Sequence, residues 1–149
     1  MTVARDIMSN KVVTIESSLS ATEIAKIMDK NKVSSIIITK DQLPIGIVTE
    51  RDLVSKIVAQ NKKPSEIRII DITASPLVVV NSLTPTDEVA EKMVDKKIRR
   101  VVVMDSNQPL GIITVTDFVK HLHDMLADSQ NYNKNLYEQL IEDWEHWMS

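Results

Sequence analysis

Hydrophobic residues follow two kinds of pattern along this chain, short continuous runs and runs with helical spacing. Ile24, Ile27 and Met28 lie three and four residues apart, which predicts the buried face of a helix. Ser18 or Ser20 is placed to cap the first turn of that helix. The continuous runs on either side are rich in β-branched residues, as is typical of strands covered on both faces. The predicted order is a strand at 12–15, a helix ending at Asn31, strands at 33–39 and 45–49, and a helix at 50–59.

The same order returns further along the chain. Gly46 and Gly111, the two glycines, lie 65 positions apart (111 − 46) and introduce the similar strings Ile-Val-Thr and Ile-Ile-Thr. Sliding the sequence by this offset aligns residues 6–54 with their counterparts without a gap. We therefore interpret the chain as a duplication of one β-α-β-β-α unit. The second copy predicts a strand at 77–80, a helix at 85–96, strands at 100–104 and 110–114, and a helix at 115–126.

Polar stretches bound the two copies. The stretch 60–65 links them, and 128–133 separates the second copy from a C-terminal tail. Apolar residues spaced by four and three predict a helix in that tail, and so short a helix needs a surface to dock on. That surface is its own module, a homodimer mate or a separate effector protein. The predicted division is 1–62, 63–127 and 128–149, and the apolar stripe of the tail is Leu136, Leu140, Trp144, Trp147 and Met148.

Composition narrows the classes of function. The 149 residues are 43% hydrophobic and 26% charged, which is ordinary for a globular protein with a core. A net charge of −3 gives no general attraction to nucleic acid or anionic lipid. The sequence has neither a signal-peptide pattern nor the run of about 20 apolar residues that spans a bilayer. We expect a cytoplasmic protein without membrane contact. Nucleic-acid binding through the basic run 96–100 is the weakest alternative.

Each copy carries Thr-x-x-Asp where its last strand meets its last helix. The residues are Thr49 and Asp52 in the first copy and Thr114 and Asp117 in the second. A carboxylate accepts hydrogen bonds in a way that suits the two hydroxyls of a ribose, and a helix start supports anions. The same spacing is a variant of the helix capping box, worth about 1 kcal/mol without any ligand. The two roles are compatible, because a cap leaves a second carboxylate oxygen available.

These motifs make the chain resemble the paired CBS domains, named for cystathionine β-synthase. The resemblance rests on the opening Asp6-Ile7-Met8 and on Gly-x-x-Thr-x-x-Asp at 46–52 and 111–117, and it covers about residues 3–126. It implies an α+β fold of two pseudo-symmetric units packed through their sheets with ligand clefts between them. The tail helix lies outside it. It also implies a regulatory module that binds AMP, ADP, ATP or S-adenosylmethionine and often forms a homodimer.

The two copies differ just before the second strand. Ser34 and Ser35 stand where the second copy has Arg99 and Arg100, and in the family these positions often reach phosphate. Guanidinium groups make charge-assisted bonds to phosphate, so we predict that the second site dominates. The alternative is a solvated basic rim. The predicted ligand-binding residues are Ser34, Ser35, Thr49, Arg51, Asp52, Arg99, Arg100, Thr114, Thr116 and Asp117.

Catalytic and metal-binding patterns are absent from the sequence. His121 and His123 lie two apart on a predicted helix and so point to different faces, and there is no cysteine. No nucleophile stands in a recognisable triad. We expect a sensor that is not an enzyme, requires no cofactor, and passes the state of an adenine nucleotide to an unknown effector protein. The alternative is an interaction module that presents its C-terminal helix without nucleotide control.

Overall fold

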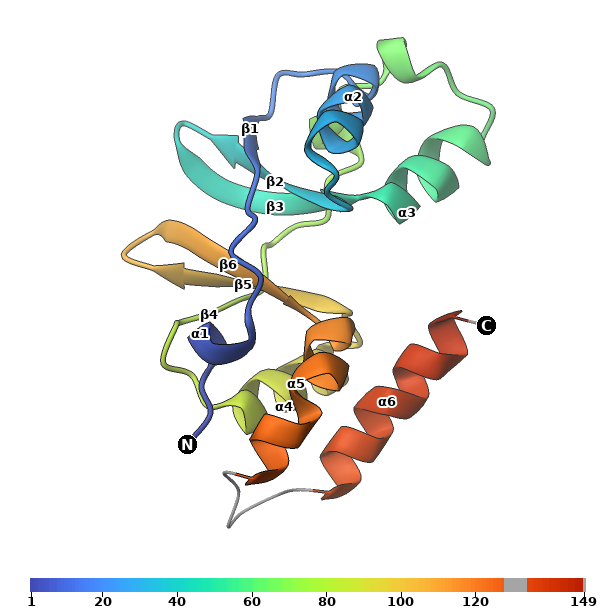
Figure 1. Cartoon of the computed structure of the whole chain (residues 1–149). Helices are drawn as coiled ribbons and strands as arrows, with labels where there is room; N and C mark the ends of the chain where they lie inside the picture. The colour runs from blue at the N-terminus through green and yellow to red at the C-terminus, as the bar shows by residue number, and fades with distance from the viewer. Residues whose placement is uncertain (128–133, 149) are drawn as a thin grey trace. The chain divides into compact units, whose positions relative to one another are not determined.

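Each copy of the duplicated sequence contributes one three-stranded sheet to the fold, which is α+β as predicted (Figure 1). The computed structural model describes residues 1–127 and 134–148. Contacts divide the chain into two units, Lys11–Val78 and a second that joins Met1–Asn10 to the residues from Val79 onward. We call them the first and the second unit, because they hold the sheets of the first and the second copy.

The sheet of the first unit has the order β1-β2-β3. Strand β1 (Thr14–Glu16) pairs in parallel with β2 (Ser35–Lys40), which pairs antiparallel with β3 (Leu43–Thr49). The parallel pair requires a crossover, and α2 (Ala21–Asn31) supplies it. Helix α3 (Glu50–Leu53) follows β3 and continues into a π-helical turn at Val54–Val58. This π-helical turn is a departure from the ordinary helix predicted over 50–59. Short 3₁₀ turns follow at Pro64–Glu66 and Ile69–Asp71.

The start of α2 is held by the predicted serine cap. Ser20 Oγ accepts a hydrogen bond from the Glu23 N–H (3.3 Å), and the Ser20 N–H donates to the Glu23 carboxylate (2.7 Å). This reciprocal pair is a capping box, and it selects Ser20 rather than Ser18 as the cap. The helix then turns its apolar face to the sheet, as its spacing predicts. The core of this unit consists of Ala21, Ile24, Met28, Ile36, Ile38, Val48, Ile57, Ile69 and Ile72.

The second unit repeats this plan. Strand β4 (Val79–Val80) pairs in parallel with β5 (Arg100–Asp105), which pairs antiparallel with β6 (Gln108–Thr114). The bounds of the predicted strands lie within two residues of the observed ones in both units. The helices of this unit are α1 (Ala4–Ile7), α4 (Thr86–Lys96), α5 (Val115–Ala127) and α6 (Lys134–Met148).

Helix α6 is the helix predicted for the tail. It packs against α4 and α5 of its own chain (Figure 1), and Leu140 is buried there. Of the predicted apolar stripe, the side chains of Trp144, Trp147 and Met148 lie outside those that the structure describes. Among the described residues, none of the helices is both long and apolar enough to cross a bilayer.

Each unit is completed by a segment that precedes the other copy in the sequence. In the first unit, Ala74 exchanges two backbone hydrogen bonds with Ile47 of β3 (3.0 and 3.1 Å). In the second unit, Ser9 exchanges two with Ile112 of β6 (2.9 and 3.0 Å). The compact units therefore cross the boundaries of the repeats. The division predicted from the repeat, 1–62, 63–127 and 128–149, follows sequence similarity and stays a prediction about the repeats.

The two glycines permit this pairing. A Cβ atom at Gly46 would lie 2.4 Å from the Ala74 carbonyl oxygen and 2.5 Å from Thr73 Cγ2. A Cβ atom at Gly111 would lie 2.7 Å from the Ser9 carbonyl oxygen. Real Cβ atoms essentially never approach so closely. Only glycine therefore lets the segment that precedes one copy, its leading segment, pair with the outer strand of the other copy.

We expect Gly46→Ala to lower the free energy of unfolding by about 1–3 kcal/mol, the usual cost of overpacking. The added methyl must push against the Ala74 carbonyl, which belongs to the backbone. Urea denaturation measures the change. Adding Thr73→Ser removes Cγ2 but not the carbonyl, so it should restore only part of the loss. An unchanged urea midpoint in Gly46→Ala would contradict the role given to this glycine.

A carboxylate ties the end of β5 to the loop before α4. Asp105 accepts hydrogen bonds from the Ser82 hydroxyl (2.6 Å) and the Ser82 N–H (3.0 Å). These two bonds, the hydroxyl first, lower the pKa of Asp105 below its ordinary value of 3.8, and the charge of Arg5 adds to them against the opposing effect of desolvation.

This lowered pKa predicts an acid-sensitive contribution to stability. The contribution is fully present above the unfolded pKa near 3.8 and is lost as pH falls through the lower folded value. Asp105→Asn should therefore reduce stability at neutral pH and flatten the loss of stability below about pH 4. Urea midpoints measured across that range test this, with the exposed Asp95→Asn as control. Equal acid profiles for Asp105→Asn and the wild-type protein would refute it.

Candidate functional site

The hairpin of the first unit brings the predicted site residues of the first copy together. Because β2 and β3 are antiparallel, the start of β2 lies beside the end of β3, and Ser35 pairs with Thr49. The Glu50 N–H donates to the Ser34 carbonyl oxygen (3.0 Å), which holds the start of α3 against the same strand end. We call Ser34, Ser35, Thr49 and Asp52 the first corner.

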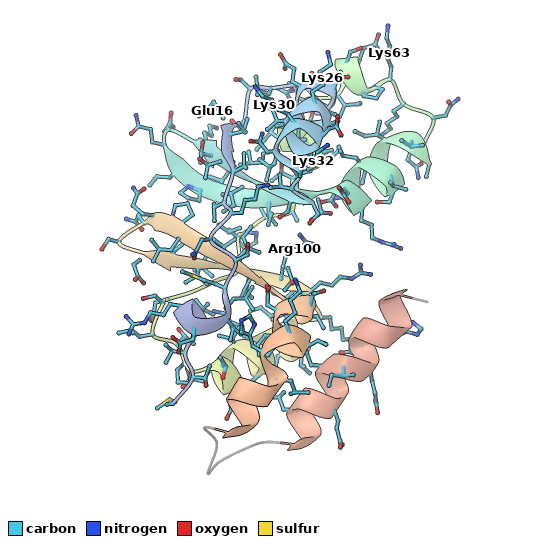
Figure 2. All side chains as sticks on the ribbon, viewed as in Figure 1. Glu16, Lys26, Lys30, Lys32, Lys63 and Arg100 are labelled. Carbon is cyan, nitrogen blue, oxygen red and sulfur yellow. The ribbon has the colours of Figure 1, made fainter. Side chains whose placement is uncertain are left out.

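The second unit builds the equivalent corner with different side chains. Arg100 pairs with Thr114, and the Val115 N–H donates to the Arg99 carbonyl oxygen (3.2 Å). Arg100 projects from the start of β5 (Figure 2), and both arginines are half-buried. We call Arg99, Arg100, Thr114 and Asp117 the second corner.

Arg51 and Thr116 are the two predicted residues that lie apart from these groups. They hold equivalent positions in α3 and α5, one residue before the aspartate, and both are exposed. Neither takes part in the hydrogen bonds that join threonine to aspartate at its corner. The structure therefore places them at the rim, and their predicted role in ligand binding stays a prediction.

In both corners the threonine and the aspartate form a cap, as the spacing allows. The Thr49 N–H and hydroxyl both donate to Asp52 Oδ2 (2.9 and 3.1 Å). The Thr114 N–H and hydroxyl donate in the same way to Asp117 Oδ2 (2.7 and 3.1 Å). One carboxylate oxygen thus receives two donors at each helix start, and the other, Oδ1, receives none from the threonine. Capping therefore leaves the second carboxylate oxygen available to another partner.

The two corners differ at Oδ1. In the first, Lys56 Nζ lies 3.2 Å from Asp52 Oδ1 and also donates to the Ile72 carbonyl oxygen (3.0 Å). The equivalent residue in the second unit is His121, whose Nδ1 donates to the Asp117 main-chain carbonyl (2.9 Å). Among the side chains that the structure describes, none reaches Asp117 Oδ1 with a hydrogen bond or an ion pair.

Sequence reasoning missed Lys56. Two signals could have found it: its spacing of four from Asp52, which places both on one helix face, and its replacement by His121 at the repeat offset. The first signal is common on exposed helices. It points to a functional difference only together with the second signal, because comparison of the two copies shows which positions they do not share.

A cavity of about 230 Å³ lies beside the second corner. Arg99 and Val115 line it on the corner side, and Gln139, Leu140 and Asp143 line it from α6. Arg99 and Asp143 thus border the same cavity. The tail helix α6 therefore lies next to an arginine of the predicted site.

The CBS domain family matches this chain twice, over residues 4–59 and 69–124. Two β-α-β-β-α units, each with a Thr-x-x-Asp corner, define the class of protein as a tandem CBS domain pair. The chain belongs to the CBS domain family, as the resemblance of its motifs implied.

Relatives agree with this assignment. An uncharacterized protein of Methanopyrus kandleri is 36% identical over 138 residues, covering 91% of this chain and 70% of that protein. A hexameric CBS-CP12 protein from bloom-forming cyanobacteria has 32% identity and a TM-score of 0.79, covering 97% of this chain and 86% of that one. A CBS domain pair solved with 5′-methylthioadenosine and S-adenosyl-L-methionine has 31% identity and a TM-score of 0.72, covering 83% of this chain and 98% of that one.

Proposed function

We propose that this chain is a regulatory module that binds an adenosine-containing ligand at its corners and modulates a partner protein. The ligand is AMP, ADP, ATP or S-adenosylmethionine. The observation that carries the proposal is Asp117 Oδ1, an acceptor without a partner in the described part of the chain, fixed in place by the Thr114 cap. The complex of a related CBS pair with two adenosine-containing molecules supports the ligand class.

The second corner suits both ends of a nucleotide. A ribose diol donates two hydrogen bonds, and Asp117 Oδ1 offers acceptor positions for them. Arg100 brings its guanidinium group to the neighbouring strand end, where it favours phosphate, and Arg99 adds a second positive charge from the cavity beside this corner. The first corner has two serines there and an aspartate already paired with Lys56. We therefore propose that the second corner is the dominant site.

The module acts without catalysis and without a required cofactor in this proposal. A ligand shifts a conformational equilibrium only if it binds one state more tightly, so the output is a change in shape or assembly that an effector protein detects. We also propose that the chain forms a homodimer. Val54 and Val119 hold equivalent positions and are 58% and 38% exposed, and Val58 is 70% exposed, so association through these helices would bury apolar surface. The hexameric relative supports self-assembly.

We expect Asp117→Ala to weaken AMP binding by about tenfold or more, since a hydrogen bond to a charged group contributes about 1.5–3 kcal/mol. Asp52→Ala should have a smaller effect, because its Oδ1 is engaged by Lys56. Isothermal titration calorimetry measures both, with the exposed Asp95→Ala as control. Reversed effects would show that the first corner dominates, and equal effects would show that neither does. No heat with AMP, ADP, ATP or S-adenosylmethionine would refute the proposal.

An interaction module that presents its C-terminal helix is the second candidate function. Helix α6 packs over α4 and α5 of its own chain with Leu140 buried, so a partner would meet the other side of the helix, where Glu138 and Glu142 are exposed. Deleting residues 129–149 separates the candidates. We expect AMP binding to persist in the truncated chain, while a protein captured by the full chain is lost if α6 is the output. Loss of AMP binding in a truncated chain that still folds, judged by circular dichroism, would make α6 part of the ligand site.

A further inference from the structure

The first and the second corner have the same backbone arrangement, so a comparison of the two shows what the side chain of Lys56 does to the corner aspartate. Capping engages Oδ2 of the aspartate in both, and the strand register around both is the same. Besides the serines and arginines, the corners differ in the residue one helical turn after the aspartate, which is Lys56 or His121. The lysine reaches the side chain of its aspartate, whereas the histidine reaches only the main chain.

Counting acceptor positions shows what this difference does. An ionised carboxylate has about four positions for hydrogen-bond donors. At Asp117, two of them are taken by Thr114, so two are left for the two hydroxyls of a ribose. At Asp52, Thr49 takes two, and the ammonium of Lys56 forms an ion pair with Oδ1 at 3.2 Å, so a ligand hydroxyl must compete with it for the positions that are left.

Lys56 is also fixed in this position more firmly than an ordinary surface lysine. Its ammonium has a second acceptor, the carbonyl of Ile72, in the segment that completes the first unit. The side chains of Lys56 and Asp52 are 43% and 19% exposed, whereas those of the surface pair Lys32 and Asp29 are 80% and 90% exposed. A partly buried pair is less screened by solvent than an exposed one. The ammonium therefore competes with a ligand hydroxyl for Oδ1.

We propose that Lys56 is an affinity-determining residue that closes the first corner to a ribose diol. The inference rests on the proposed function, because it concerns the same carboxylate that the ligand would use. It assigns the inequality of the two copies to an occupied acceptor in the first corner, in addition to the arginines of the second. Removal of this one ammonium then makes the first corner a ribose site.

The test uses adenosine and AMP as separate probes in the full chain. Asp117→Ala is the background, so that titration reports on the first corner. In that background, Lys56→Met keeps the aliphatic stem but removes the ammonium, and adenosine should bind about tenfold more tightly, the effect of one recovered hydrogen bond to a charged group. Lys30→Met, at an exposed lysine on α2 (Figure 2), is the matched control and should change nothing.

Adenosine has no phosphate, so it separates two roles of the lysine. If Lys56 instead contacts phosphate, Lys56→Met weakens AMP and leaves adenosine unchanged, which overturns the inference. An unchanged affinity for both probes also overturns it.

The reciprocal change gives a second arm. His121→Lys in the Asp52→Ala background should weaken adenosine binding at the second corner, and unchanged binding there would count against the inference. Binding by the wild-type chain without any response to these substitutions defeats this inference alone. A wild-type chain that binds neither probe defeats the proposed function as well.

Discussion

The close approach of main chain to main chain at Gly46 and Gly111 is the contact on which the rest of each unit depends. It pairs an outer strand with a segment from elsewhere in the sequence and so covers an edge that would otherwise expose unpaired N–H and C=O groups. The same contact carries apolar residues into the core, Ile69 and Ile72 in the first unit and Ile7 in the second. It also brings the carbonyl of Ile72 to Lys56, so the chemistry of the first corner follows from it.

In the proposed function, the aspartate of a corner serves both the stability of the fold and the recognition of a ligand. Oδ2 receives two hydrogen bonds from threonine and fixes the start of the helix, which is a gain that needs no ligand. Oδ1 is held in a set direction as a result, so a ligand that binds there meets an acceptor already ordered. If the proposed ligand binds there, the same side chain serves as cap and as binding site, and a threonine substitution would disturb both.

Much of the fold could be predicted because the same β-α-β-β-α pattern occurs twice in the sequence. The apolar spacing of Ile24 and Met28 and the cap at Ser20 follow local rules, and the duplication extended each assignment to the second copy. The antiparallel hairpins then brought the predicted Ser35 and Thr49 together. Periodicity shows that a residue is buried but not which unit buries it. It therefore could not predict that the segment before each copy completes the unit of the other copy. The contact of Lys56 with Ile72 depends on that tertiary packing, and nothing in the spacing of residues 50–59 indicates the π-helical turn.

The exchange of leading segments means that one repeat taken alone is incomplete. It would lack the residues that close its sheet and fill its core, and would have to take them from a second copy of itself. Covalent fusion turns that bimolecular exchange into an intramolecular one, at a high effective concentration. The duplicated chain has the connectivity of a swapped dimer whose halves can no longer dissociate. Joined in one chain, the two halves need not be identical, and they differ at Lys56 and His121.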